Sequence, residues 1–435
     1  MKKKIVWLDY FFVIYYILLL LGLILYDNVN SSPGTVKRIA YLMALIIPVL
    51  YKREFLPVVL LSIWSITKSS YSYPYVPTEP LIFLAIMMGF AIFNRQKISI
   101  TPFFIVIVLH VFLNSFVLQG HLSKRLPFPL LEFFILFFCV EKSKLKFNAT
   151  ILPYVFIITS LAITYWFFFC ENAKMEIVHH VANTDMETEG WMDPNYLSGI
   201  VGMGCVIAIN GLINGFKNVL FIILCIITIV ASLFTAAYAA SRGGMIAIAM
   251  SALILFLMSG VKMRTKILVI TSVVGFLIIM FKLGAFELLQ ARVEIGEGDM
   301  TNGRLDIWQR KLTSFVNEGN LFSWMFGFGE EGGGHLGHYS HLQGSHNDFI
   351  AILCNYGLLG LGLFITCLIY PIKKASPKMK PIIIAFVVYL GTVCFSLEPF
   401  SLGYMSYLAF YFYVIILSRY SCWVQKLEKL NTKNA

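Results

Sequence analysis

Apolar runs of about 20 residues recur along the whole chain, and short polar segments separate them. An α-helix of about this length is needed to cross the hydrocarbon core of a membrane. The sequence therefore predicts an all-α, polytopic integral membrane protein with about 14 transmembrane helices (12–14), forming a single transmembrane domain over residues 1–435. The expected spans are 5–26, 38–51, 55–68, 80–93, 99–118, 127–140, 150–170, 194–213, 219–239, 243–260, 267–284, 348–371, 381–397 and 402–418.

Charged residues make up only 13% of the chain, whereas 58% of its residues are hydrophobic. A soluble domain carries about a quarter charged residues, so this chain could not cover a water-facing surface. The net charge of +11 would suit a nucleic-acid partner, but the basic residues form short clusters between apolar runs. That pattern is typical of cytoplasmic loops, and no nucleic acid is expected.

The basic clusters also orient the chain in the membrane. If the N-terminus is inside and the sides alternate, about two thirds of the 34 Lys and Arg residues fall in inner segments. Because inner loops carry an excess of positive charge, both termini are expected on the cytoplasmic side of a bacterial inner membrane. Residues 285–347 then form a large periplasmic or extracellular loop, which is long enough for two or three amphipathic helices.

Arginines stand at two places near the outer ends of expected spans. Arg242 lies in a Ser-Arg-Gly-Gly sequence between two long apolar runs, and Arg304 follows Gly303, with Arg292 before it. A guanidinium group binds phosphate or diphosphate through two hydrogen bonds and keeps its charge. The alternatives are contact of Arg242 with lipid headgroups and an amphipathic helix around Arg304 that rests on the membrane surface.

A histidine stands at the outer end of a later span. His346 and Asn347 directly precede the apolar run 348–371, where imidazole would be poised near neutral pH to act as a base. A hydrogen-bonding histidine at the membrane interface is the alternative. Gly357 and Gly360 follow one helical turn apart and would allow another helix to approach closely.

Three further histidines, His335, His338 and His341, lie in a Gly-rich stretch and could ligate a metal. The glycines favour a flexible loop, and no Cys or paired carboxylate completes the set, so no metal is expected. The eight cysteines form no Cys-x-x-Cys pair and lie mostly in or beside apolar runs, as small packing residues do. Nucleotide-binding and hydrolase motifs are missing, and few charges lie within the spans, which disfavours an ATP-driven or proton-coupled carrier.

Four motifs, in this order, carry a resemblance to a known family. They are Asp193-Pro194-Asn195, Ser241-Arg242-Gly243-Gly244, Gly303-Arg304-Leu305-Asp306-Ile307-Trp308, and His346-Asn347 followed after nine residues by Gly357-Leu358-Leu359-Gly360. Together, over residues 190–362, they resemble the superfamily of O-antigen polymerases and O-antigen ligases (Wzy and WaaL type). The first 190 residues share only its hydropathy, and the Gly- and His-rich stretch 332–341 departs from what this family leads one to expect.

The resemblance implies a glycosyltransferase with a GT-C-like bundle, and the form of the arginine motifs favours a polymerase. It would join undecaprenyl-diphosphate-linked repeat units into O-antigen or capsular polysaccharide at the outer face of the inner membrane, inverting the anomeric carbon without metal or cofactor. A chain-length regulator and a flippase would be its partners. The alternatives are an O-antigen ligase that transfers polymer to lipid A-core, and a lipid-linked oligosaccharide flippase without catalysis.

The resemblance also implies roles for individual residues. His346 would be the general base that deprotonates the acceptor hydroxyl. In place of a metal, the positive charges of three arginines would stabilise the diphosphate leaving group, namely those of Arg242, Arg292 and Arg304. The residues expected to support this site are Asp193, Asn195, Asp306 and Asn347.

Overall fold

The computed structural model describes residues 152–169, 194–214, 219–239, 241–260, 303–337 and 344–400, with single positions at 14–18, 267–284 and 407–418. Over these residues the chain is helical and has no strand, which confirms the all-α expectation for this part. The six spans expected before residue 150 lie outside the described residues, apart from the helical positions Ile14, Tyr15 and Leu18.

The long helices of the described part begin and end close to the bounds expected from hydropathy. They are α7 (Leu152–Phe169), α9 (Pro194–Ile213), α10 (Val219–Tyr238), α11 (Arg242–Met258), α17 (Asp348–Lys374) and α18 (Lys380–Ser396). Of these, α7, α9, α10 and α17 are long and apolar enough to cross a membrane, and α11 and α18 are apolar helices of 17 residues. This part of the chain is therefore built as a membrane protein.

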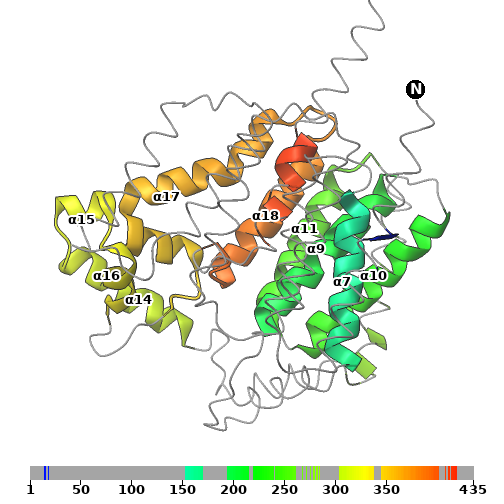
Figure 1. The fold of residues 1–435 in the computed structure, drawn as a ribbon, viewed down its shortest axis with the longest axis horizontal. Coiled ribbons are helices and arrows are strands. Elements are labelled where there is room, and N and C mark those ends of the chain that lie inside the picture. Colours follow the sequence, from blue (N-terminus) through cyan, green and yellow to red (C-terminus); the bar gives the residue numbers. More distant parts are fainter. Residues whose placement is uncertain are drawn as a thin grey trace, which may run out of the picture.

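Helix α9 forms the centre of the bundle, where it packs against α7, α10 and α11 (Figure 1). In α9, 83% of the most apolar stretch of 18 residues is buried within the protein, whereas the same share in α10 is 33%. Helix α9 is therefore an inner helix, and α10 faces outward. Glycines let neighbours approach α9 closely, because a Cβ at Gly202 would overlap Tyr389 and one at Gly204 would overlap Ser160.

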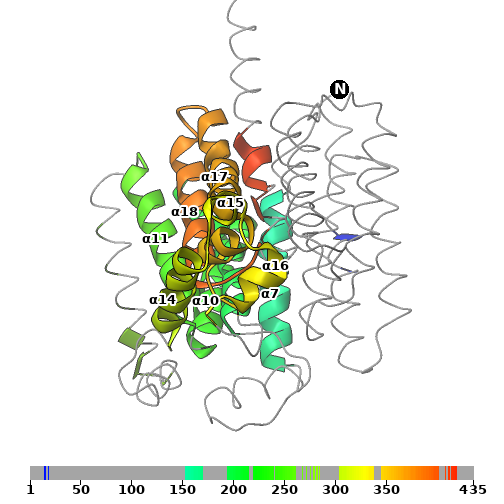
Figure 2. The same ribbon diagram turned by 90° about the vertical axis from the view of Figure 1, so that its left-hand side faces the viewer.

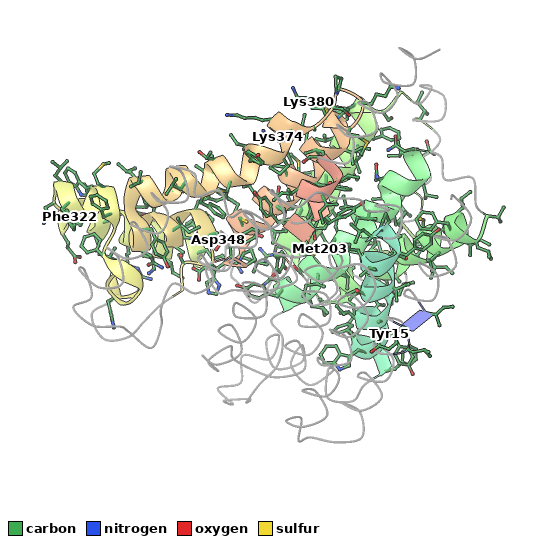
Figure 3. The ribbon with its side chains drawn as sticks, turned by 45° about the horizontal axis from the view of Figure 1, so that its top comes forward. Tyr15, Met203, Phe322, Asp348, Lys374 and Lys380 are labelled. Carbon is green, nitrogen blue, oxygen red and sulfur yellow. The ribbon has the colours of Figure 1, made fainter. Side chains whose placement is uncertain are left out.

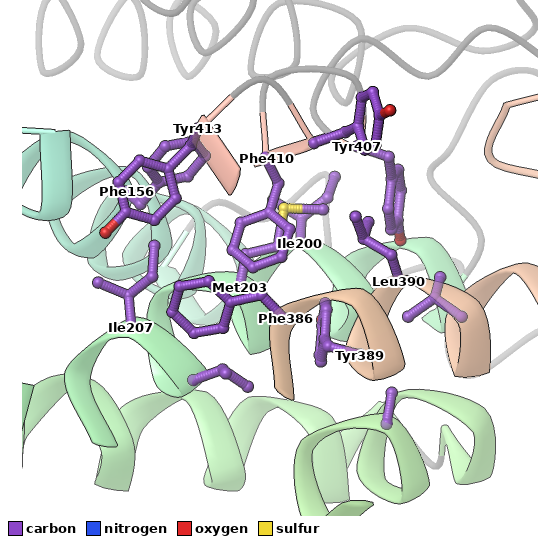
Figure 4. Packing of buried hydrophobic residues seen from close by; sticks show 14 of the residues in the cluster. Phe156, Ile200, Met203, Ile207, Phe386, Tyr389, Leu390, Tyr407, Phe410 and Tyr413 are labelled. Carbon is purple, nitrogen blue, oxygen red and sulfur yellow. The ribbon is translucent and has the colours of Figure 1, made fainter. Parts of the chain in front are cut away.

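Aromatic side chains fix α18 against α7 and α9 (Figure 4). The Phe410 ring lies at the centre of this cluster, with its centroid 5.4 Å from that of Phe386, 5.5 Å from Tyr389 and 5.8 Å from Phe156. The Tyr389 hydroxyl donates a hydrogen bond to the Gly199 carbonyl, so its polar atom is satisfied within the core. This packing holds the end of α18 close to the beginning of α9.

Three short helices, α14 (Arg304–Asn317), α15 (Leu321–Phe326) and α16 (Gly329–His335), pack against α17. Both ribbon views show α17 and α18 side by side, with α14 to α16 gathered at one end of α17 (Figures 1 and 2). A small apolar core joins these helices and consists of Phe315, Leu336, Ile350 and Cys354. The chain between Arg304 and His335 is thereby attached to the bundle through α17.

Helix α17 is broken at Gly357, where the sequence predicts a continuous helix. Gly357 has φ 69° and ψ −171°, a backbone conformation that is almost restricted to glycine. A Cβ at this position would lie 2.6 Å from the Gly327 nitrogen and would overlap the backbone of Met325. Gly327, at the end of α15, has a similar conformation with φ 84° and ψ −176°. The close approach that Gly357 was expected to allow therefore occurs, but at a bend and not along a straight helix.

Replacing Gly357 with alanine is expected to destabilise the packing of α15 and α16 on α17 by about 3 kcal/mol, the scale of a Gly-only conformation plus an overpacked contact. The matched control is Gly362→Ala in the same helix, where no atom lies within 4 Å of an added Cβ. Thermal unfolding of the full chain in detergent measures both variants. Equal melting temperatures for Gly357→Ala and Gly362→Ala would contradict the prediction.

Candidate functional site

Arg242 is the first residue of α11, and a buried polar cluster holds the backbone before it. Ser241 caps the helix by accepting a hydrogen bond from the Gly244 nitrogen. The Ser241 hydroxyl also donates to Asn195 Oδ1 at 3.1 Å and accepts from the Ser198 hydroxyl at 2.5 Å. The beginning of α11 is thus tied to the first turn of α9.

Arg304 is likewise the first residue of its helix, α14. It follows Gly303, whose φ of 73° lets the chain turn sharply into the helix. Arg304 Nη1 donates a hydrogen bond to the carbonyl of Ser396 at 2.6 Å. A Cβ on Gly243 would lie 2.5 Å from the Ser396 hydroxyl oxygen. Ser396, the last residue of α18, therefore adjoins both the Arg304 side chain and the residue that follows Arg242.

His346 is held in a left-handed backbone conformation between two buried neighbours. Its φ is 49°, the one positive value among the described non-glycine residues. Trp308 of α14 donates from Nε1 to the Ser345 carbonyl at 2.7 Å. Asn347 caps α17 by accepting hydrogen bonds from the nitrogens of Phe349 and Ile350. His346 itself is half-buried, so the residue is partly accessible while its two neighbours are held by hydrogen bonds.

The turn Ser396–Phe400 after α18 contacts the beginnings of α9, α14 and α17. The Asp348 nitrogen donates to the Leu397 carbonyl, and the Phe400 nitrogen donates to Asp348 Oδ2, both at 3.0 Å. The Ser345 hydroxyl donates to Glu398 Oε1. The Glu398 nitrogen donates to the Tyr196 hydroxyl at 3.3 Å. Together with the Arg304 contact, these bonds make the turn the common neighbour of both arginine motifs and of the histidine.

Two charged residues of the turn and of α14 are buried. Glu398 is 6% exposed and Lys311 is 3% exposed. Lys311 Nζ donates to the carbonyls of Gly333 at 3.0 Å and Gly334 at 3.4 Å, near the end of α16, where a cation is favourable. Burial lowers the pKa of the Lys311 amine, and the nearby Cys354 and Glu398 partly offset that effect. These contacts join α14 and α16 into one unit beside His346.

Most of the expected site residues that the structure describes converge on this place. Arg304 bonds to Ser396, and Gly243, directly after Arg242, adjoins Ser396. Ser345 and Asp348, which flank His346 and Asn347, bond to Glu398 and Leu397, and Asn195 bonds to Ser241 directly before Arg242. Asp306 instead lies exposed in the first turn of α14. Asp193 and Arg292 lie outside the described residues.

The histidine-rich stretch is described only in part. His335 ends α16 and is exposed, whereas His338 and His341 lie outside the described residues. Among the residues that the structure does describe, no three His, Cys, Asp or Glu side chains are grouped so as to hold a metal ion.

Sequence reasoning missed the residues that hold the site together, above all Ser396, Glu398 and Lys311. Glu398 gave one usable signal, because it is a carboxylate in a short segment between two apolar runs, where a charge is costly unless it has a partner. Lys311 gives no comparable signal in the sequence. Its burial follows from contacts with α16, which no local pattern reveals.

The arrangement suits an anionic ligand next to a base. Arg242 and Arg304 each begin a helix, where the helix dipole favours negative charge. His346 lies on the same end of α17 as Asp348, which Figure 3 shows apart from Lys374 and Lys380. The arginine motifs and the histidine therefore gather at the end of α17 and α18 that is opposite their basic ends.

Part of the chain that contains these residues is similar to a known family. Residues 227–365 match the family model Wzy_C, described as O-antigen ligase. The matched range contains Arg242, Arg304 and His346 and ends before the Ser396–Phe400 turn. No curated protein matches the chain. Residues 227–365 are therefore similar to the superfamily of O-antigen ligases and polymerases, and the helices apolar enough to span a membrane support an integral membrane protein.

Proposed function

We propose that the protein polymerises undecaprenyl-diphosphate-linked oligosaccharide repeat units at the outer face of the bacterial inner membrane. The convergence of Arg242, Arg304 and His346 on the Ser396–Phe400 turn carries the proposal. The form of the Gly-Arg-Leu-Asp-Ile-Trp block favours a polymerase. The product would be O-antigen or capsular polysaccharide.

In the proposed reaction the acceptor hydroxyl oxygen attacks the anomeric carbon of the donor sugar from the face opposite the diphosphate. The hydroxyl proton passes to His346 as the new carbon–oxygen bond forms. The bond between the anomeric carbon and the diphosphate breaks, and its electron pair leaves with the diphosphate. Arg242 and Arg304 stabilise the charge that develops there, with Arg292 as a third cation. Displacement from the opposite face inverts the configuration of the anomeric carbon.

The proposed setting of this site is a GT-C-like bundle of about 14 spans with both termini in the cytoplasm. The basic ends of α17 and α18, at Lys373, Lys374 and Lys380, then face the cytoplasm. The arginine–histidine end faces outward, where no nucleotide sugars exist and the donor is carried by a lipid. A flippase would deliver the repeat units, and a chain-length regulator would limit the polymer.

The second candidate function is O-antigen ligation, because the matching family model bears that description. Ligation and polymerisation share the same attack on a diphosphate-linked sugar and differ in the acceptor. A ligase would use lipid A-core, whereas a polymerase uses a second lipid-linked unit. The roles proposed for Arg242, Arg304 and His346 are the same for either acceptor.

Deleting the gene and analysing the surface glycan separates the candidates. For a polymerase we expect core that carries a single repeat unit, with no ladder of longer chains. Bare core with polymer left on the lipid carrier would establish the ligase instead. Accumulation of single units on the cytoplasmic leaflet would overturn both and indicate a flippase. Complementation with the wild-type gene is the control for polar effects of the deletion.

A further inference from the structure

Helix α15 exposes most of its large apolar side chains. Leu321 is 75% exposed, and Phe322, Trp324 and Met325 are each more than one third exposed. Four such residues in a helix of six form a patch of a kind that soluble surfaces rarely carry without a partner. In Figure 3, Phe322 lies at the far end of the molecule from Met203 of the inner helix α9. These side chains are therefore not part of the buried aromatic core around α9.

Hydrogen bonds within the protein cap both ends of α15. Asn320 Oδ1 accepts hydrogen bonds from the nitrogens of Phe322 and Ser323, both at 3.0 Å, and the Asn320 nitrogen donates to the Ser323 hydroxyl at 2.8 Å. The Gly327 nitrogen donates to the Ser323 carbonyl at 2.7 Å. Both ends of the helix are thus capped, which is required where no water is present.

The indole of Trp324 is satisfied in the same way. Its Nε1 donates to the Phe315 carbonyl of α14 at 3.1 Å. The exposed part of the ring is therefore apolar and would leave no unpaired donor in an apolar medium. A helix capped at both ends, with its indole donor paired, is suited to contact with lipid.

The length of α17 after the break at Gly357 indicates at which depth of the membrane α15 lies. From Leu358 to Lys374 the second part of α17 has 17 residues, about 25 Å of helix, which is close to the thickness of the hydrocarbon core. Its basic end carries Lys373 and Lys374. The opposite end, at Gly357 and Leu358, therefore lies at the other membrane surface.

Helix α15 is attached at that end of the span. The backbones of Met325 and Gly327 touch Gly357, and the Phe328 nitrogen donates to the Cys354 carbonyl at 2.9 Å. Leu358, directly after the break, is 54% exposed. Ile365 and Ile369 are exposed further along the same span. The apolar patch of α15 thus continues the lipid-facing surface of α17.

We propose that α15 is a membrane anchor that inserts Leu321, Phe322 and Met325 among the lipid acyl chains of the leaflet opposite Lys373 and Lys374. The occupant of this patch is lipid, because the patch adjoins the exposed face of a helix long and apolar enough to span a membrane, and because the ends of α15 and the Trp324 indole have hydrogen-bond partners within the protein. The anchor holds α14, and with it Arg304, at the level of the lipid headgroups. The inference does not depend on which glycan the protein handles.

The test uses the full chain in lipid nanodiscs that hold one copy each. Leu321→Cys is labelled with an environment-sensitive fluorophore, and the nanodiscs contain phospholipid with a nitroxide quencher high on the acyl chain. The matched control is Thr313→Cys, at an exposed position of α14. Unsubstituted protein treated with the same reagent gives the background, and the described native cysteines are buried.

We expect several-fold stronger quenching at position 321 than at position 313, together with blue-shifted emission at 321. Phe322→Cys repeats the measurement and is expected to behave like Leu321→Cys. Equal quenching at 321 and 313 would overturn the anchor. Blue-shifted emission at 321 without nitroxide quenching would also overturn it, since protein and not lipid would then cover the patch.

Discussion

Replacing His346 with alanine is expected to reduce glycan polymer formation by about 10²- to 10⁴-fold, the usual contribution of a general base. Hydrogen bonds to Ser345 and Asn347 hold the backbone on either side of His346, so the variant should insert and fold normally. Polymer ladders from membranes, compared at equal protein level, measure the effect. The matched control is His335→Ala, an exposed histidine at the end of α16 that should retain full activity.

The left-handed backbone at His346 requires a second variant. Alanine adopts a φ of 49° less readily than asparagine, so part of the loss in His346→Ala could come from backbone strain. Asparagine tolerates that conformation but cannot act as a base near neutral pH. His346→Asn is therefore expected to be as inactive as His346→Ala. Full-length polymer from His346→Asn would show that the imidazole is not the base.

Replacing Arg304 with alanine is expected to lower turnover by about 10²- to 10³-fold, the range observed when one group that stabilises transition-state charge is removed. Arg304→Lys keeps the charge and loses the planar pair of donors, so we expect activity between those of wild type and Arg304→Ala. The matched control is Arg310→Ala, an exposed arginine of the same helix, which should be nearly unaffected. Single-turnover rates with lipid-linked donor measure all three variants.

Arg304 also has a structural contact that the measurement must separate. Its bond to the Ser396 carbonyl would be lost, which costs about 1–3 kcal/mol of stability for a charged donor. Thermal unfolding reports this loss, and turnover per folded molecule reports the chemistry. A fall in activity that only matches the fall in folded protein would contradict a role at the diphosphate.

The sequence predicted the helices of the described part well, because a run of apolar residues is a local property. The bounds expected for α9 and α10 agree with the structure to within one residue, and the start expected for α17 agrees as well. A helix at Arg304, which the sequence offered as an alternative, is present as α14. Features that depend on contacts between residues far apart in sequence were harder to predict.

The break at Gly357 shows why. A Gly-x-x-Gly sequence fits both a straight helix that packs closely and a bend, and only the contact with Gly327 decides between them. The Ser396–Phe400 turn was missed for a similar reason. Its partners Ser345, Asp348 and Tyr196 are far away in sequence, so no spacing or periodicity connects them.

The same distances determine when the site can form during synthesis. Ser396 is 92 residues after Arg304, and Glu398 is 202 residues after Tyr196. Nascent chains that end between His346 and Ser396 contain all three side chains proposed for the chemistry, yet lack the turn that contacts their motifs. On the proposed function, we expect a chain to be inactive until Phe400 has been synthesised. A product truncated after His346 would keep every named group of the mechanism and have no assembled site.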